Sequence, residues 1–430
     1  MIPAARIAAA IDVIADIAAR RRPAADALKD WGQTHRFAGS KDRAAIASLV
    51  YDALRRKSSS ARIMGEASPR AEMLGMLREL RGHSPAEIAS LFSGEGHAPA
   101  ALSAAESDAL EAGGLVGAPD HIAGDYPEWL VPAFAGVFGD RAVEEGRALA
   151  ARAPVDLRVN RLAMGRDKAL VELEHLAARP TPLSPIGLRL PLTADGRGPA
   201  LSAEPAYAKG HVEIQDEGSQ IAALCALAHP GEQILDYCAG GGGKTLALAA
   251  ETQNKGQIYA YDSDGRRLMP IYARLERAGA RNVQVRAPKG ATDVLADLRG
   301  RCDLVVVDAP CTGSGTWRRN PDAKWRMRPG ALGQRMKDQD EAIGNASKYV
   351  KPGGRLLYVT CSVLREENED RLAAFLALAP TFGLLDARDV VRRAGMPALM
   401  GRANDFGLRL SPATTGTDGF FIAMLERRSA

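Results

Sequence analysis

The first third of the chain shows the spacing of amphipathic helices. Apolar side chains recur at positions i, i+3 and i+4 in residues 5–19 and 41–56, which predicts two helices. The Ala- and Ile-rich opening resembles a signal peptide, but Arg6, Asp12 and Asp16 interrupt it and favour an amphipathic helix. Residues 94–103 are rich in Gly, Pro and Ala and predict a loop. We therefore expect an all-helical domain over residues 1–145.

The pattern changes after residue 145. The segment VDLRVN (residues 155–160) alternates like a strand, residues 167–178 favour a helix, and a stretch containing Pro180, Pro182 and Pro185 follows. We interpret residues 146–205 as a small α+β linker domain.

From about residue 206 onward, strand-like and helix-like segments alternate. The expected strands are QILDY (233–237), QIYAYD (257–262), NVQVR (282–286), DLVVVD (303–308) and GRLLYVT (354–360). Expected helices follow them at residues 245–251, 266–278, 291–298, 332–349 and 366–378. This alternation predicts a mostly parallel sheet with helices on both faces. A late apolar pair near residues 408–410 and 419–425 adds an antiparallel hairpin at one edge, so we expect an α/β domain over residues 206–430.

Composition narrows the class of protein. Hydrophobic residues make up 46% and charged residues 25% of 430 residues, and no apolar run reaches the roughly 20 residues of a membrane span. The five cysteines form no CxxC pair and the seven histidines are scattered, so we expect neither disulfides nor a bound metal, in a reducing cytoplasm. The net charge is only +4. Basic residues bunch at 20–22, 55–57 and after Trp317, and an isolated cluster of this kind is more often a solvated face.

A glycine-rich loop follows the first expected strand. Asp236 ends that strand, and Lys244 opens the next helix; between them lie Cys238, Ala239, Gly240, Gly241, Gly242 and Gly243. Glycines let a backbone approach a ligand, and the helix that follows offers free N–H groups. The second strand ends in Asp262, whose carboxylate can accept hydrogen bonds from both ribose hydroxyls. The loop and the acid together predict a nucleotide-like ligand.

Other interpretations of the loop fit less well. A P-loop NTPase would need glycine where this chain has Cys238. A dinucleotide-binding oxidoreductase would need G-x-G-x-x-G, which the run does not cleanly contain. A merely flexible surface loop is a poor explanation, because four glycines between a strand and a helix cost conformational entropy.

Two cysteines stand at the ends of two further strands. Cys311 follows Asp308 in DAPC, and Cys361 follows the apolar run LLYVT, whereas Cys225 and Cys302 have the surroundings of core residues. A thiolate that adds to carbon 6 of cytosine makes carbon 5 able to attack a methyl sulfonium, and a second thiol can assist the later elimination. Lys244, or the helix after Cys361, is a candidate for lowering the pKa of the attacking thiol.

At these residues the chain resembles the Nol/Nop/Sun family of RNA 5-methylcytosine methyltransferases, in particular its RsmB-like branch. The segments that carry the resemblance are DAPCTGSGTWRRNPDAKW (308–325), YVTCSVLREENE (358–369), the glycine-rich loop, VEIQDEGSQ (212–220), LRVNRL (157–162), DGFFIAMLER (418–427) and GSKDRAAIASLVYDALRR (39–56). It implies a Rossmann-like, S-adenosylmethionine-dependent methyltransferase domain, preceded by a NusB-like helical RNA-binding domain and a small α+β linker domain.

The resemblance also implies roles for individual residues. Cys361 is the nucleophile and Cys311 the release cysteine, with Asp308 and Lys244 beside them. S-adenosyl-L-methionine is expected to contact Asp262, Asp308 and residues 238–244. Ribosomal RNA is the favoured substrate. A transfer-RNA methyltransferase and a non-catalytic ribosome-assembly factor remain alternatives. A DNA cytosine methyltransferase would not need Cys361.

The chain departs from the family pattern at two places. Its loop is C-A-G-G-G-G-K where the family has C-A-A-P-G-G-K, so Gly241 replaces a proline. After the third strand it has Ala287 and Pro288 where the family has an aspartate near the adenine.

Aromatic and basic residues alternate in TWRRNPDAKWRMR (316–328). An RNA contact by this segment would use Trp317, Arg318, Arg319, Lys324 and Arg326, the aromatic ring stacking an unpaired base and the cations holding phosphates. The alternative is that the tryptophans belong to the core. A target cytosine must be single-stranded or flipped out to reach Cys361, and we expect a monomer that binds RNA and no membrane.

Overall fold

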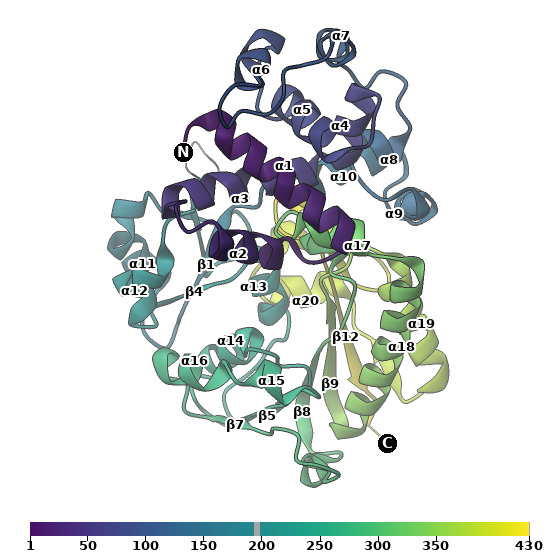
Figure 1. Ribbon diagram of the computed structural model, residues 1–430. Coiled ribbons are helices and arrows are strands. Elements are labelled where there is room, and N and C mark those ends of the chain that lie inside the picture. Colours follow the sequence, from purple (N-terminus) through teal and green to yellow (C-terminus); the bar gives the residue numbers. More distant parts are fainter. Residues whose placement is uncertain (193–197, 430) are drawn as a thin grey trace. The chain divides into compact units, whose positions relative to one another are not determined.

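The computed structural model describes residues 1–192 and 198–429. Contacts between Cα atoms group these residues into two compact units (Figure 1). The first unit holds Met1–Arg152 and Trp317–Arg328, and the second holds Ala153–Thr316 and Pro329–Ala430. A stretch of the C-terminal half therefore folds with the N-terminal helices, which the sequence-based domain boundaries did not anticipate.

The first unit is helical. Its α-helices are α1 (Pro3–Arg20), α2 (Ala24–Thr34), α3 (Ser40–Arg55), α4 (Lys57–Met64), α5 (Pro69–Glu79), α6 (Pro85–Leu91), α7 (Ala104–Ala112), α8 (Asp120–Ala123), α9 (Val131–Phe138), α10 (Ala142–Ala150) and α17 (Pro321–Arg326). The two helices expected from apolar spacing are confirmed as α1 and α3. Ile14 of α1, Ile46 of α3 and Leu74 of α5 are buried in one apolar cluster. Ser84 and Ser103 form capping boxes at the starts of α6 and α7.

The segment Trp317–Arg328 packs into this helical unit. Trp317 is 1% exposed, and its ring stacks on Phe134 with 6.0 Å between centroids. The Nε1 of Trp325 donates to the Leu54 carbonyl at 2.6 Å, and the Nζ of Lys324 donates to the Arg55 carbonyl at 3.3 Å. These contacts fix α17 against the end of α3.

The second unit is built on a large mixed sheet. Its strands are β5 (Gln233–Asp236), β6 (Gln257–Ala260), β7 (Val283–Val285), β8 (Cys302–Asp308), β9 (Val350–Thr360), β10 (Phe382–Leu384), β11 (Leu408–Leu410) and β12 (Phe420–Arg427). The order is β10-β12-β9-β8-β5-β6-β7, with β11 also paired to β12. Strands β5 to β9 pair in parallel, while β10, β11 and β9 all pair antiparallel to β12. The Rossmann-like fold and the late hairpin are confirmed; β10 was not foreseen.

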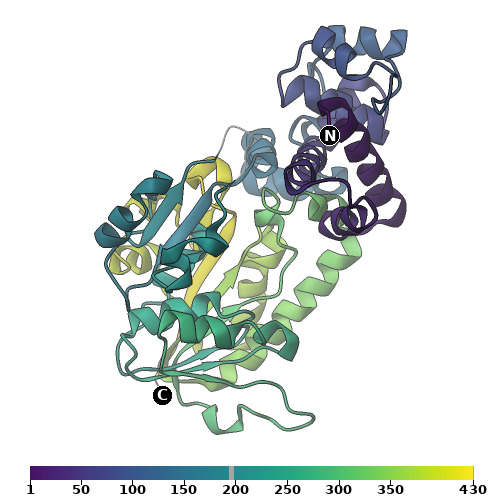
Figure 2. The same cartoon turned by 60° about the vertical axis from the view of Figure 1, so that its left-hand side comes forward.

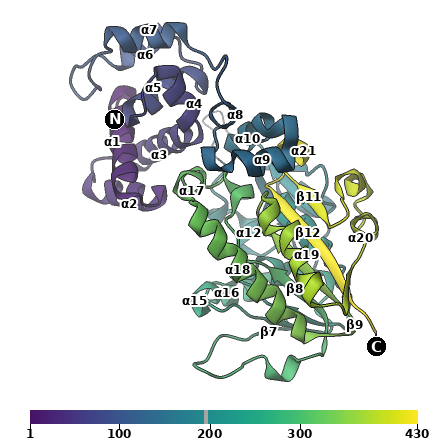
Figure 3. The same cartoon turned by 90° about the vertical axis from the view of Figure 1, so that its right-hand side faces the viewer.

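Helices cover both faces of this sheet. They are α13 (Glu217–Leu224), α14 (Gly243–Glu251), α15 (Gly265–Leu268), α16 (Ile271–Ala278), α18 (Pro329–Ala346), α19 (Glu369–Leu378), α20 (Ala387–Arg393) and α21 (Pro412–Thr415). One face packs Ile221 and Ala249 against Ile234. The other packs Ile343 and Leu372 against Leu235, beneath α18 and α19, which run side by side in Figure 3. The successive residues 234 and 235 point to opposite faces, as a strand requires.

Three expected helices differ from the structure. The helix expected over 266–278 is divided into α15 and α16 at Pro270, which lacks the backbone N–H of a helix interior. Residues 291–298 form only a single 3-10 turn, Ala296–Leu298, because the Asp293 carboxylate accepts from the Leu295 N–H at 3.1 Å. The helix expected from residue 366 begins at Glu369, after a 3-10 turn over Arg365–Glu367.

A second, smaller sheet belongs to the same unit (Figure 2). Its strands are β1 (Val155–Val159), β2 (Arg179–Pro180), β3 (Gly187–Leu190) and β4 (Val212–Ile214), in the antiparallel order β2-β3-β1-β4. Two α-helices accompany it, α11 (Arg166–Glu172) and α12 (Pro205–Ala208), and the remaining 3-10 turns of the chain are short. β4 lies beyond the boundary expected at residue 205, so the small sheet draws its last strand from the segment that leads into α13.

We predict that Trp317→Ala lowers the free energy of unfolding of the full-length protein by about 3–5 kcal/mol, because it leaves a cavity in the helical unit. Trp317→Phe should cost much less, since the ring remains and the buried Nε1, which has no hydrogen-bond partner among the described residues, is removed. Urea denaturation followed by circular dichroism measures both changes. Equal stability of Trp317→Ala and the unmodified protein would contradict the core position of this side chain.

Candidate active site

The residues singled out in the α/β domain meet at one edge of the large sheet. Strands β5 and β8 are neighbours, and the chain order runs away from them in both directions, through β6 on one side and β9 on the other. Ligands of open α/β sheets bind outside the carboxyl ends of the strands at such a reversal. Asp308 is the last residue of β8, and Asp262, Cys311 and Cys361 follow the ends of β6, β8 and β9.

The two cysteines lie in contact. Cys311 follows β8, Cys361 follows β9, and their Sγ atoms are 3.3 Å apart. The adjacent, parallel strands bring them together, with Asp308 in register with Val359. The hydrogen bond with Cys361 and burial raise the pKa of the Cys311 thiol well above its ordinary value, so Cys311 holds its proton at neutral pH.

A buried carboxylate holds the two cysteine loops together. Glu367 is 0% exposed and accepts hydrogen bonds from the backbone N–H of Thr312 at 2.8 Å and from the Ser362 hydroxyl at 2.5 Å. Thr312 and Ser362 are the residues that directly follow the two cysteines. Gln339 donates a further hydrogen bond from Nε2 at 2.9 Å. Glu367 was not among the predicted site residues, although it lies in the TCSxxxxEN segment.

The loop after Cys361 is fixed by its own hydrogen bonds and not by a helix. Asn368 donates to the Ser362 carbonyl at 3.0 Å and accepts from the Thr360 hydroxyl at 2.5 Å. Gly315 donates to the Cys361 carbonyl at 3.0 Å. α19 begins only at Glu369, with Asn368 as its N-cap residue, and activation of Cys361 by this helix N-terminus stays a prediction.

Lys244 and Asp308 form an ion pair at the same edge. The Nζ of Lys244 lies 2.6 Å from Oδ2 of Asp308 and 5.6 Å from the centroid of the Phe420 ring. The Lys244 side chain is 7% exposed and that of Asp308 is 36% exposed, so the carboxylate is the open member of the pair. The contact of Lys244 is thus with Asp308, which orients that carboxylate beside the cysteines.

The glycine-rich loop is held from behind by two arginines. Arg274 donates from Nη1 to the Gly241 carbonyl at 2.6 Å, and Arg158 donates to the Gly243 carbonyl at 2.6 Å. Burial lowers the pKa of Arg158 to about 10. Gly242 has φ +82, and a Cβ there would lie 2.4 Å from Ile271, so this position requires glycine. The arginine anchor fixes the backbone at the position where the resembled family has proline.

Asp262 closes the other side of the loop. It is 1% exposed, accepts from the N–H groups of Gly240 and Asp264 at 3.0 Å each, and pairs with Arg267 at 3.3 Å. A cavity of about 330 Å³ opens beside it; its lining includes Tyr237, Cys238, Tyr261, Asp262, Ser263, Arg267, Pro310, Arg335, Asp338, Glu341, Ala342 and Asn345.

The polar lining contributed by α18 was missed. Arg335, Asp338 and Asn345 recur at helical spacing, which could have indicated one polar face. Ala287 and Pro288, where the family has its adenine-side aspartate, are exposed in the loop after β7. The polar side chains of this cavity therefore come from α18 and from the segment Asp262, Ser263 and Arg267, whereas Ala287 and Pro288 do not line it.

The residues expected to bind RNA divide into two sets. Trp317, Arg318 and Lys324 are 1%, 5% and 1% exposed, so this structure removes them from the residues free to contact RNA. Arg319 is partly buried, and Arg326 is more open and pairs with Asp322 at 3.0 Å. The alternation of aromatic and basic residues therefore serves partly to attach the segment to the helical unit.

The described residues contain neither a metal-binding cluster nor a membrane-spanning helix. No group of three or more His, Cys, Asp and Glu side chains there is arranged to hold a metal ion. No helix within residues 1–192 and 198–429 is long and apolar enough to cross a membrane.

Two models of one protein family match this chain. A model of the 16S rRNA methyltransferase RsmB/F family matches residues 223–426, and one of the RsmF/B-like ferredoxin-like domain matches residues 126–195. The chain belongs to the RsmB/F methyltransferase family.

Individual relatives agree with the family models. Ribosomal RNA small subunit methyltransferase B of Klebsiella pneumoniae is 34% identical over 305 residues, which are 70% of this chain and 66% of that relative. The match thus spans slightly less than two thirds of the relative's length. The solved structure of PH0851 has a TM-score of 0.72 and 25% identity over 99% of both chains. A methyltransferase homologue from Pyrococcus horikoshii has a TM-score of 0.58 and 25% identity over 72% of this chain and 97% of that one.

The contact between the two thiols is testable without substrate. Diamide oxidises neighbouring thiols to a disulfide, so brief treatment of the native protein should link Cys311 to Cys361. Cys225 and Cys302, both 0% exposed, should stay reduced. Peptide mass spectrometry identifies the linked pair, and Cys311→Ser should abolish it. Independent modification of the two thiols, without a link, would contradict the observed proximity.

Proposed function

We propose that this protein transfers a methyl group from S-adenosyl-L-methionine to carbon 5 of a cytosine in RNA, through a covalent bond between Cys361 and carbon 6. The observation that carries the proposal is the contact of Cys311 and Cys361 at 3.3 Å, at the ligand-binding edge of a methyltransferase fold. A single nucleophilic cysteine would not need a second thiol so close.

The chemistry assigns different tasks to the two thiols. The Cys361 thiolate adds to carbon 6, and the displaced ring electrons make carbon 5 nucleophilic toward the methyl group. We assign to Asp308, whose carboxylate pairs with Lys244 at 2.6 Å, the hydrogen bond to the cytosine edge. The proton on carbon 5 must then leave, so that the bond from carbon 6 to sulfur can break and the Cys361 thiolate depart.

Cys311 is suited to assist this last step. The largest cause of its raised pKa is the hydrogen bond with Cys361. That hydrogen bond is lost once the Cys361 sulfur is bonded to carbon 6, so the pKa of Cys311 falls at the stage when a base is needed.

The residues around the glycine-rich loop fit a sulfonium nucleoside. When bound, the cofactor supplies the methyl group. Asp262, with its carboxylate at the end of β6, can accept the ribose hydroxyls, and Gly240 at φ +49 lets the loop approach without a side chain. The cavity beside Asp262 offers Tyr261 and the polar face of α18 for the remainder of the nucleoside.

We propose ribosomal RNA of the small subunit as the substrate, since the relatives carry that name. The target cytosine must be unpaired or flipped out, because carbon 6 of a stacked base is inaccessible to a thiol at the sheet edge.

The two cysteines should give different phenotypes. Cys361→Ala should abolish methyl transfer, because carbon 5 is never activated. Cys311→Ala should allow addition and methylation but slow the loss of the carbon 5 proton, so that protein and RNA stay joined. A denaturing gel with substrate RNA and S-adenosylmethionine should then show a shifted, nuclease-sensitive band for Cys311→Ala.

The double variant is the control for this experiment. It should give no band, since Cys361 makes the bond. A band that persists without Cys361 but disappears without Cys311 would reverse the assignment, to the arrangement expected of a DNA cytosine methyltransferase.

Asp262→Ala should weaken S-adenosylmethionine binding by about 1–3 kcal/mol, through the loss of charge-assisted hydrogen bonds to the ribose. Asp264→Ala is the matched control, because this neighbouring carboxylate accepts from the Arg266 N–H at the start of α15. Isothermal titration calorimetry measures both affinities. If Asp262→Ala binds the cofactor as tightly as the control does, Asp262 does not belong to the ribose site.

A further inference from the structure

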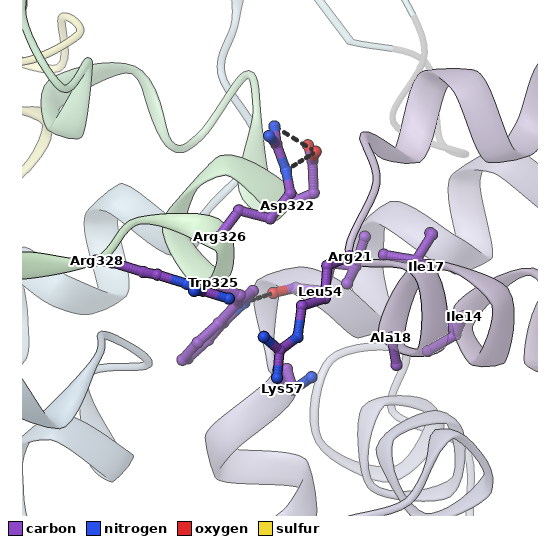
Figure 4. A pocket seen from close by; sticks show the side chains of 10 residues that line it. All are labelled: Ile14, Ile17, Ala18, Arg21, Leu54, Lys57, Asp322, Trp325, Arg326 and Arg328. Carbon is purple, nitrogen blue, oxygen red and sulfur yellow. Dashed lines mark hydrogen bonds and ion pairs between the residues drawn. The ribbon is translucent and has the colours of Figure 1, made fainter. Parts of the chain in front are cut away.

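Three basic clusters that are far apart in the sequence meet in one cavity of the helical unit. The cavity, shown in Figure 4, has a volume of about 550 Å³, within the usual range for small-ligand sites. Its lining includes Arg21, from the cluster at 20–22; Lys57, from the cluster at 55–57; and Arg328, from the run after Trp317. Taken separately, each cluster resembled a solvated face. The fold of the helical unit brings one residue of each cluster to the same cavity.

The charge of this cavity is not neutralised from within. Arg21, Lys57, Arg326 and Arg328 face a single carboxylate, that of Asp322. Asp322 is already paired with Arg326 at 3.0 Å. Lys57 pairs with Glu72 at 3.3 Å, outside the lining. Within residues 1–192 and 198–429, neither Arg21 nor Arg328 forms an ion pair, and both are exposed. The cavity therefore presents at least two cations with no carboxylate partner to an incoming ligand.

An aromatic ring and an apolar wall stand beside these cations. The Trp325 indole is fixed by its hydrogen bond to the Leu54 carbonyl at 2.6 Å, with the Lys324 ammonium 4.7 Å from a ring centroid. Ile14 and Ile17 of α1 form an apolar part of the lining. In Figure 4, Arg328 extends toward Trp325, and Arg21 extends from the end of α1 toward Lys57.

Arg21 is held in this place by an unusual backbone conformation. It caps α1 with φ 51 and ψ 40, in the left-handed region that residues other than glycine rarely adopt. Arg22 next to it forms ion pairs with Asp16 and Asp30 at 2.5 Å each, whereas Arg21 turns into the cavity. The end of α1 therefore separates the two guanidinium groups.

We propose that this cavity binds one unpaired nucleotide of the RNA substrate, its base against Trp325 and the apolar wall and its phosphate on Arg21 and Arg328. Guanidinium groups match phosphate oxygens in geometry, and an aromatic ring stacks any unpaired base. The proposal rests on the proposed function in one respect, that the substrate is RNA. RNA binding was already expected of the helical domain; the new element is a cavity and the residues in it that hold one nucleotide.

The test uses the full-length protein and a fluorescein-labelled single-stranded RNA. Arg21→Ala combined with Arg328→Ala should weaken binding about tenfold and lower the steepness of the salt dependence by about 0.7, because one phosphate is no longer neutralised. The control combines Lys29→Ala with Arg36→Ala, two exposed cations of the same unit that do not line the cavity. It should change both quantities much less. Equal losses in the two double variants would overturn the proposal.

Two further arms identify the ligand. The Arg21 and Arg328 double variant should bind a duplex of the same sequence almost as tightly as the unmodified protein does, because a paired base cannot enter the cavity. If its affinity for the duplex falls as much as its affinity for the single strand, the two arginines act only through their charge and the proposal is overturned. Inorganic phosphate should not displace the labelled RNA when it is added at the same phosphate concentration as an unlabelled competitor RNA that does displace it. Displacement by inorganic phosphate would assign the cavity to free phosphate and overturn the proposal.

Failure of this proposal is separable from failure of the proposed function. The covalent band of Cys311→Ala does not depend on Arg21 or Arg328 when RNA is saturating. If Cys311→Ala gives the band but the Arg21 and Arg328 double variant binds RNA with unchanged affinity, only the proposal for the cavity is overturned. Loss of affinity without any band in Cys311→Ala overturns the function and leaves the cavity standing.

Discussion

The carboxylate of Glu367 joins the loops that carry Cys311 and Cys361, the proposed catalytic residues. Its two oxygens accept from the residue after Cys311 and from the residue after Cys361, in addition to the hydrogen bond from Gly315 to the Cys361 carbonyl. The side chain is fully buried, so its desolvation must be offset by these hydrogen bonds and that of Gln339. The thiols, 3.3 Å apart, lie on the two loops that this buried group joins.

Two arginines fix the glycine-rich loop by donating hydrogen bonds to its carbonyl oxygens. Arg158 extends from the small sheet to the Gly243 carbonyl, and Arg274 extends from α16 to the Gly241 carbonyl. Glu213 of β4 pairs with Arg274 at 3.0 Å, so the small sheet also positions the second arginine. The small sheet thus supports the cofactor loop from behind, and a glycine-rich segment that is costly to order is fixed through its carbonyls.

Site residues that follow directly from a local pattern could be predicted from the sequence. The positions of residues that depend on partners far away in the chain could not. The strands before Asp262, Cys311 and Cys361 are apolar runs, and each of these residues comes shortly after its run ends. The three residues could therefore be placed at one edge of the sheet without a structure. Trp317 could not be placed, because the same alternation of rings and cations suits both an RNA surface and a core; Phe134 decides it. The role of Glu367 needed the register of β8 and β9, which no local pattern contains.

The central claim is that carbon 5 of cytosine is the methyl acceptor and passes through a covalent adduct. RNA that carries tritium at carbon 5 of cytosine tests this most directly, because methylation at that carbon must expel the hydrogen. With S-adenosylmethionine and the unmodified protein, we expect one tritium released to water for each methyl group incorporated, and neither event with Cys361→Ala. Methyl incorporation with the tritium retained on the ring would contradict the account.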